Sequence, residues 1–416
     1  MSMANKRRRT CTISDDDDGE PLPLDLLLEI LARSDVRTVL RCAATSKTIR
    51  RVILGQDFHR RRRLALLRTD GFDPALLLGV SYMVNTAPVA FRGEHLRFDA
   101  RLLRSHELVD SRDGFVVLQQ REKIPFHDRL PPRCAVPIIC DLRVCDSLTG
   151  ETYRLPPPPA IGYGYPHALL LTHDDGGGGR SFQLLAADRG LRTQTFSSTD
   201  GRWGPVLETT HYASQYPYSA PVEHKDYTSR PIVLYGSGAA VHVHWLRLRS
   251  KECMYGSHAP HIVALDVGSA QLATRIDLPP ECVSRMGWIQ NATTGLQLAT
   301  SSSPTGSLAV LVAEILVISM WTLEDSSTPA WIRQVVIKRQ LIRKQPPGPR
   351  THYIRFMGFG QRSGTVLLKT DSVGLVQLNL GSKDVVIIET DSFNLNCTQL
   401  CLHEINLSSL LQAMGQ

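Results

Sequence analysis

Hydrophobic positions follow two different periods along the 416-residue chain, and the change between them falls near residue 80. Before that point, apolar residues recur at helical spacing in three segments, Leu26–Leu31, Val36–Ala43 and Ile49–Ile53. A fourth segment with the same period, Phe58–Leu67, follows Asp57, a residue type that caps helix N-termini. The pattern therefore predicts a short α-helical module followed by a further helix.

After residue 80 the helical period disappears, and short runs rich in Val, Ile and Leu alternate with Gly, Pro, Ser and Asp. In Val376–Leu380 apolar and polar residues alternate, which predicts a half-buried antiparallel strand. The other clear runs are Phe115–Leu118, Ile232–Tyr235, Val241–Leu248, Ile262–Val267, Val335–Ile337, Val366–Leu368 and Val385–Ile388. The larger part of the chain is therefore predicted to be β.

Weak repeats run through this β region. Asp146, Asp266 and Asn379 each stand in a strand–turn–strand unit, and they lie 120 and 113 residues apart. That spacing approximates three repeats of ~40 residues, the size of a four-stranded propeller blade. Two further hairpins, Phe196–Trp203 and Trp321–Trp331, have polar turns closed by tryptophan. We expect a β-propeller-like domain, in which six to eight blades of ~40–50 residues would fit.

The domain organisation follows from these periods. Residues 1–20 contain a basic run, Lys6–Arg9, and an acidic run, Asp15–Asp18, with almost no apolar residues, which is the composition of a disordered tail. We predict a disordered tail over 1–20, a helical module over 21–55, a linker helix over 56–80 and a β domain over 81–416. The fold class is mainly β with an α-helical N-terminal module.

The nine cysteines are scattered without a Cys-x-x-Cys pair, so neither a disulfide framework nor a zinc ribbon is encoded. The basic run Lys6–Arg9 is not followed by the apolar core of a signal peptide, so we expect a cytoplasmic or nuclear protein. Leu308–Leu323 is shorter than the ~20 residues of a membrane-spanning helix and contains Glu314. We interpret it as one or two buried strands and expect no membrane partner.

Residues 22–53 resemble an F-box. The similarity lies in the Leu22-Pro23 start, the Ile30-Leu31 pair that ends the leucine-rich segment, and the string from Leu40 through Cys42 to Ser46-Lys47. Ile49 departs from the pattern, because many members of the family carry tryptophan there. The following chain resembles the β-rich regions of plant F-box proteins, of kelch or F-box-associated type, in Val144–Gly150 and Phe196–Trp203.

The resemblance implies a substrate-recognition subunit of an SCF-type ubiquitin ligase. In that family the helices dock on a small acidic adaptor of the Skp family, and through it on the cullin scaffold, while the second domain holds a protein substrate. The implied adaptor-binding residues are Leu22, Pro23, Leu26, Leu27, Ile30, Leu31, Leu40, Cys42, Lys47 and Ile49. The size of the helical module is consistent with this docking role. Three helices in ~35 residues are too few to bury a core alone, so we expect them to share an apolar face with another domain or a partner.

Two alternatives come from other classes. The first is a basic nucleic-acid-associated protein that uses Arg60–Arg63. Residues 33–68 hold eleven Lys and Arg against two Asp, a net charge of +9, whereas the rest of the chain sums to −2. Because the positive charge is confined to residues 33–68, the nucleic-acid interpretation is weakened for most of the chain. A positively charged segment of this kind suits binding to an acidic adaptor.

The second alternative is a propeller enzyme. His242 and His244 share a predicted strand face, but with Cys253 they match no zinc-ligand spacing. Gly236-Ser237-Gly238 lacks the third glycine and the following helix of a dinucleotide fingerprint, so it is interpreted as a hairpin turn. We therefore predict no catalytic residues, no metal and no cofactor, and a protein that is not an enzyme.

Overall fold

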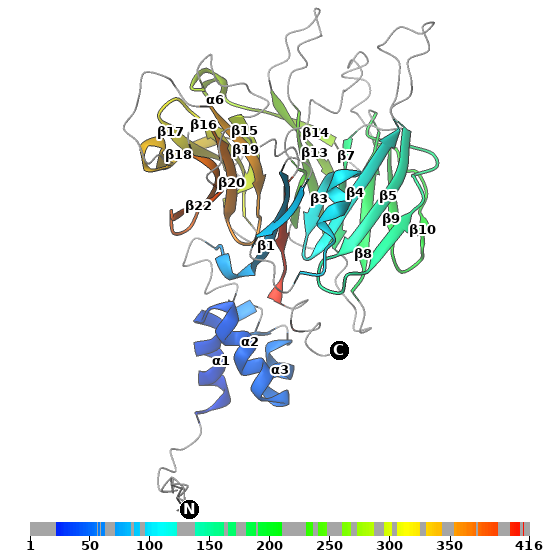
Figure 1. Cartoon of the computed structure of the whole chain (residues 1–416). Helices are drawn as coiled ribbons and strands as arrows, with labels where there is room; N and C mark the ends of the chain where they lie inside the picture. Colours follow the sequence, from blue (N-terminus) through cyan, green and yellow to red (C-terminus); the bar gives the residue numbers. More distant parts are fainter. Residues whose placement is uncertain are drawn as a thin grey trace, which may run out of the picture.

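The computed structural model consists of a small helical module joined to a ring of β-sheets (Figure 1). The residues that the structure describes are 22–55, 57–58, 60–62, 71–84, 87–91, 96–122, 138–161, 165–171, 180–188, 190–209, 230–235, 240–247, 260–267, 273–286, 295–301, 306–324, 330–342, 353–371, 373–389, 400–407 and 411. The predicted tail, residues 1–20, lies outside them.

Three helices, α1 (Leu24–Arg33), α2 (Val36–Thr45) and α3 (Lys47–Ile53), form the helical module. Asp35 caps α2 by accepting the Thr38 N–H at 3.0 Å, which satisfies one of the donors that a helix leaves open. Ser46 caps α3 in the same way by accepting the N–H of Ile49. These helices cover the three segments predicted from the apolar spacing.

Among the described residues of the β domain, most strands belong to five four-stranded antiparallel sheets, which we call blades. The first blade contains β3 (Glu107–Arg112), β4 (Phe115–Glu122), β5 (Ile138–Asp146) and β6 (Thr152–Leu155). The second contains β7 (Tyr165–Leu171), β8 (Phe182–Ala187), β9 (Thr193–Ser197) and β10 (Arg202–Trp203). The third contains β11 (Ile232–Tyr235), β12 (Val241–Arg247), β13 (His261–Asp266) and β14 (Ala273–Asp277). The fourth contains β15 (Leu296–Thr300), β16 (Leu308–Ala313), β17 (Val317–Glu324) and β18 (Ala330–Lys338), and the fifth contains β19 (Ile354–Phe359), β20 (Thr365–Thr370), β21 (Gly374–Asn379) and β22 (Val385–Glu389).

A three-stranded sheet closes the ring. It pairs β1 (Leu77–Val84) with β2 (Ala87–Phe91) on one side and with β23 (Leu400–Glu404) on the other, in antiparallel register. The inner strand of each sheet contacts the inner strands of its neighbours, and β23 contacts both β3 and β19. The two ends of the β domain therefore meet in one sheet, which is the arrangement of a closed propeller.

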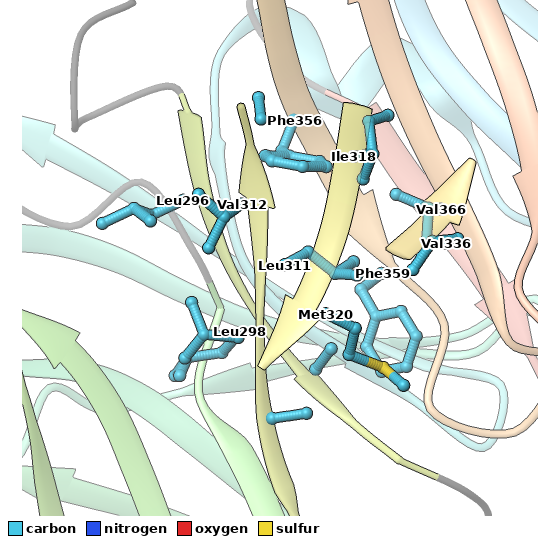
Figure 2. Close-up of a cluster of buried hydrophobic side chains, with 14 of the residues drawn as sticks. Leu296, Leu298, Leu311, Val312, Ile318, Met320, Val336, Phe356, Phe359 and Val366 are labelled. Atoms are coloured by element: carbon cyan, nitrogen blue, oxygen red, sulfur yellow. The ribbon is translucent and has the colours of Figure 1, made fainter. Parts of the chain in front are cut away.

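The blades pack face to face through buried aliphatic side chains. Figure 2 shows Leu311 and Met320 of the fourth blade beside Phe359 and Val366 of the fifth. All four are under a tenth exposed, and a buried side chain of this kind contributes about 1.5–3 kcal/mol to folding. β16, inside the fourth blade, is buried at all of its positions, which is why its sequence, LAVLVA, reads as a continuous apolar run.

Each predicted β run overlaps a strand, and the expected propeller-like fold is confirmed. The interpretation of the repeat spacing is wrong, however. The hairpins with Asp146, Asp266 and Asn379 close the first, third and fifth blades, while the tryptophan hairpins close the second and fourth. The intervals of 120 and 113 residues therefore span two blades of about 60 residues each, rather than three of the ~40 residues expected for a compact blade.

The chain between the module and the ring differs from a continuous linker helix. Residues 57–58 and 60–62 are helical, Pro74–Leu76 form a 3-10 turn (η1), and 77–80 already belong to β1. Residues 63–70 lie outside the described part. The β domain therefore begins at Leu77, four residues before the predicted boundary.

Leu308–Leu323 forms β16 and most of β17, as the interpretation of this segment as buried strands requires. Glu314 lies in the turn between them, and its carboxylate accepts hydrogen bonds from Arg333 at 2.6 Å and Ser319 at 2.5 Å. Burial raises the pKa of this carboxyl, but the bonds from Arg333 and Ser319 outweigh it and leave the pKa lowered. Among the described helices, none has the length and apolar character that crossing a membrane requires.

The strand directions give the ring two different faces. On the proximal face, β23 ends and β1 begins beside the helical module, and short turns such as 113–114, 198–201 and 360–364 join the strands. On the opposite, distal face some turns are short, such as 314–316, but other described strands are separated by much longer stretches of chain. The longest of these are 123–137, 204–231, 248–260, 278–295 and 339–353. The described strand ends that flank these stretches lie on the face away from the helical module.

Candidate functional site

Helix α1 presents large apolar side chains to solvent. Leu22 is 57% exposed, Leu26 49% and Ile30 47%, and Pro23 beside them is also exposed. Leu26 and Ile30 share a helix face because they are four residues apart. We call these four residues the α1 apolar surface. Several exposed side chains of this size in contiguous positions mark an interaction site more often than an ordinary surface.

The opposite side of α1 builds the core of the module. Leu28, Leu31 and Ala32 are buried in one cluster with residues of all three helices and of the propeller. The other buried members are Val36, Val39, Ala43, Ile53, Phe58, Leu76, Leu407 and Leu411. The module therefore completes its core with Leu76, which directly precedes β1, and with Leu407 and Leu411, which follow β23. This agrees with the argument that so short a segment cannot bury a core alone.

The structure separates the ten residues implied by the resemblance into three groups. Leu22, Pro23, Leu26, Ile30 and Lys47 are exposed. A second group is half-buried at the rim of the module core, namely Leu27, Leu40, Cys42 and Ile49.

Leu31 forms the third group alone. It is only 2% exposed, so its assignment to a docking surface needs correction: it belongs to the core. Consecutive helix positions differ by about 100° in direction, so Ile30 and Leu31 face different sides although both lie in the apolar stripe. Leu24, 44% exposed, was missed as a possible contact.

One buried arginine joins the module to the propeller. Arg62, 6% exposed, donates to the Asp73 carboxylate at 2.8 Å and to the carbonyl oxygens of Ser34 at 2.9 Å and Leu31 at 3.4 Å. Asp73 in turn donates its backbone N–H to Arg362 at 3.0 Å. The guanidinium therefore connects the C-terminal end of α1 to the β19–β20 turn.

Aromatic packing supports the same junction. The rings of Phe72 and Phe359 meet edge to face, with centroids 6.2 Å apart and an interplanar angle of 85°. A β-carbon on Gly364 would lie 2.5 Å from the Phe72 ring, so only glycine fits there. Phe72 thus fills a site that the β19–β20 turn leaves open for it.

Arg60–Arg63, the basis of the nucleic-acid alternative, do not act as one exposed patch. Arg62 is buried in the junction, and Arg61 lies 3.6 Å from Asp25. Arg63 lies outside the described residues. Exposed basic side chains are instead spread over the module, namely Arg33, Arg41, Lys47, Arg51, Arg60 and Arg61. Such a distribution raises the encounter rate with an acidic protein partner.

A buried histidine forms hydrogen bonds at the place where the two ends of the β domain meet. His403 on β23 is fully buried, and its ring nitrogens lie 2.9 Å from Ser81 Oγ on β1 and 2.8 Å from Ser147 Oγ in the first blade. Burial, together with nearby Arg230, lowers the pKa of this imidazole to about 3. The ring is therefore neutral at physiological pH and bridges two serines.

The remaining sequence motifs lie only partly within the described residues. His244 is buried while His242 is half-buried, and Cys253 and Gly236–Gly238 lie outside the described residues. Within the part of the chain that the structure describes, no group of three His, Cys, Asp or Glu side chains could hold a metal ion.

Comparison with known families assigns an F-box domain to the helical module and a second family to the β-propeller-like domain. The F-box domain matches residues 21–61, and a domain of unknown function, DUF7595, matches residues 80–416. The chain belongs to the DUF7595 family. An F-box domain implies, in general, the role of a substrate adaptor in SCF ubiquitin ligases, and F-box proteins are typically non-enzymatic.

Solved structures resemble this chain only weakly. A puromycin-hydrolyzing peptidase of Mycobacterium tuberculosis is 10% identical, with a TM-score of 0.32, over 68% of this chain and 38% of that chain. The N-terminal domain of Nup159 is 14% identical, with a TM-score of 0.28, over 65% and 63%. A quinonprotein alcohol dehydrogenase-like protein from Bacteroides thetaiotaomicron is 11% identical, with a TM-score of 0.31, over 77% and 63%.

The chain spans less than two thirds of each of these proteins, and none of the similarities is strong enough to bear on function. No curated protein matches the chain.

Proposed function

We propose that this chain is the substrate-recognition subunit of an SCF-type ubiquitin ligase. The α1 apolar surface docks on the Skp-family adaptor, which links the chain to the cullin scaffold, and the propeller holds a target protein. Catalysis is then by proximity, because the ligase supplies the chemistry and this chain raises the local concentration of the target lysine. The proposal includes a cytoplasmic or nuclear location, and a plant origin from the similarity of Val144–Gly150 to plant F-box proteins.

One observation carries the proposal: α1 divides its leucines between a core face and an exposed face. A helix that served only the internal core would bury its apolar stripe, whereas Leu22, Leu26 and Ile30 are each about half exposed or more. The half-buried Leu27, Leu40 and Ile49 extend this surface towards α2 and α3. The exposed cations, which occur on all three helices of the module, complement an acidic partner.

The architecture supports the division of labour between the domains. The module lies at the proximal face, where turns are short, and the long connections leave the strands at the distal face. Loops on a rigid β scaffold are common sites of recognition. The Arg62–Asp73 ion pair and the shared leucine core hold the two domains in one orientation, so a target bound at the distal face would be presented at a fixed distance from the adaptor.

Capture of a purified Skp-family adaptor tests the proposal. Wild type should retain the adaptor, and the triple variant Leu22→Ala/Pro23→Ala/Ile30→Asp should lose it, because a charge replaces the centre of an apolar contact. Leu316→Ala/Leu341→Asp is the matched control, since these leucines are 72% and 70% exposed on the distal side of the fourth blade. Equal recovery of the adaptor by wild type and the triple variant would refute the docking role.

A further inference from the structure

The axis of the propeller contains a cavity whose polar lining is only partly satisfied. It lies between five inner strands, β3, β11, β15, β19 and β23, and it has a volume of about 60 Å³. That volume has room for a few water molecules or for one small polar group. It falls far below the ~300–1,000 Å³ of pockets that hold drug-sized ligands. Any occupant is therefore the end of a side chain or a very small molecule.

The atoms of the lining that lack a partner include two that can donate hydrogen bonds. The Thr300 hydroxyl is buried, with the residue 2% exposed, and it has no hydrogen-bond partner among the described residues. Nε of Arg112 is buried without a partner as well, although its terminal nitrogens bond to Val233 and Gln361. A buried donor without an acceptor costs about 1–3 kcal/mol, so such groups in a native cavity indicate a missing acceptor.

The acceptors of the lining, in contrast, are already occupied. The two carboxylate oxygens of Asp110 each accept a backbone N–H at 2.8 Å, from Ser111 and Leu169. Glu404 likewise accepts the N–H groups of Ser363 at 2.8 Å and Arg362 at 3.3 Å.

Asp113 is paired with Arg362 through two bonds, one of 2.6 Å. Burial also raises the pKa of both Asp110 and Glu404.

Three arginines, Arg112, Arg230 and Arg362, and three carboxylates, Asp110, Asp113 and Glu404, line the cavity. Arg112 and Arg230 line it, and their bonds run to carbonyl and amide oxygens rather than to carboxylates. The Nε–H of Arg112 and the Thr300 hydroxyl line the same small space and are the donors there that lack an acceptor among the described residues, which is what a bound anion would supply.

We propose that this axial cavity binds a carboxylate group, supplied by an acidic side chain of the target protein. The inference deepens the proposed function and rests on it for the source of the carboxylate. One carboxylate oxygen would accept the Nε–H of Arg112 and the other the hydroxyl of Thr300, the two donors of the lining that lack an acceptor within the described part of the chain. The propeller would thereby select targets that can place an aspartate or glutamate at the ring axis.

The test uses the full chain bound to its adaptor and two probes. The first is a fluorescent peptide of glycine and serine with one central glutamate, compared with the same peptide carrying glutamine. The second is sodium acetate, compared with sodium chloride at equal ionic strength, with the melting temperature as the readout. The glutamate peptide should bind at least tenfold more tightly than the glutamine peptide, and acetate should raise the melting temperature and compete with the peptide.

Two cavity variants and one control make the test specific. Thr300→Val keeps the side-chain shape and removes a hydroxyl that has no partner, so it should fold normally and reduce glutamate-peptide affinity about fivefold or more. Arg112→Met should reduce that affinity to the glutamine-peptide level. Arg202→Gln, an equal loss of charge on the exposed outer strand β10, should change nothing.

Equal binding of the two peptides, or equal effects of all three variants, would overturn the proposal. Stabilisation by acetate without discrimination between the peptides would overturn the peptide source and point to a free small acid. Adaptor capture, measured on the same samples, reports separately on the proposed function. Loss of peptide discrimination with full adaptor capture would thus refute only the cavity assignment.

Discussion

Arg62 is the residue on which the junction between the two domains most depends. Its guanidinium and the Asp73 carboxylate are both about nine-tenths buried, and their separation is 2.8 Å. Removing one member of a buried pair leaves the other charge without compensation, which costs about 3–5 kcal/mol. We therefore expect Arg62→Met to lower the free energy of unfolding by about that amount, measured by urea denaturation at pH 7.

The matched control is Arg33→Met. Arg33 also forms an ion pair, with Glu29 at 2.6 Å, but both side chains are largely exposed. Exposed pairs contribute about 0.2–1 kcal/mol, so this variant should remain near wild type. Similar losses in the two variants would show that Arg62 does not act as a buried clamp.

The lowered pKa of His403 leads to a prediction about the stability of the fold at acidic pH. Because its folded pKa of about 3 lies below the unfolded value near 6.5, the unfolded chain binds the proton first as pH falls. Its contribution is therefore fully present above pH 6.5 and is lost progressively towards pH 3, by roughly 3 kcal/mol at pH 4. Unfolding measured from pH 7 to pH 4 should show a shallower loss for His403→Gln than for wild type. Parallel curves would contradict this assignment.

At the scale of elements, the β19–β20 turn is predicted to depend on Gly364 for two separable reasons. Gly364 has φ +65, and a β-carbon there would also meet the Phe72 ring. Gly201, in the β9–β10 turn, has the same φ of +65, but a β-carbon would meet nothing within 4 Å. Gly201→Ala should cost only the backbone strain of about 1 kcal/mol.

Gly364→Ala should cost clearly more than Gly201→Ala, because Phe72 must move away from Phe359 as well. The difference in urea midpoint between the two variants isolates the packing contribution to the domain junction. Equal midpoints would mean that the Phe72 contact does not hold the domains together.

The elements themselves were largely predictable because their signals are local. A run such as Val366–Leu368 predicts a strand without knowledge of its neighbours. The hairpin turns were also recognised from the sequence. The sequence did not reveal which of these hairpins belong to adjacent blades. Blade spacing depends on the length of the distal connections, and that length has no periodic signal in the sequence.

Residue directions within one element were harder to predict. Ile30 and Leu31 are adjacent branched aliphatic residues of the F-box motif, yet the side chain of Ile30 is 47% exposed and that of Leu31 only 2%. Arg62 likewise stands in a run of four arginines, and only its contacts with Asp73 and Ser34 distinguish it from a solvated cation. The burial of Leu31 and of Arg62 is determined by tertiary packing, and the properties of a single residue do not predict it.

For the whole molecule, ring closure was the feature least accessible from sequence. The closing sheet pairs Leu77 with Glu404 and Tyr82 with Leu400, at opposite ends of the β domain. Neither β1 nor β23 signals that partner locally, so the number of blades could not be derived. The F-box, in contrast, was recognisable because its motif lies within a single short segment and matches over residues 21–61.

The central claim is that the helices dock on the adaptor while the propeller remains free for a target. Hydrogen–deuterium exchange of the full chain, with and without saturating Skp-family adaptor, tests it most directly. Backbone amides in 22–33 and 40–49 should exchange at least tenfold more slowly in the complex, with no change in the strands of the five blades. Unchanged exchange in α1, or protection confined to the propeller, would contradict the proposed function.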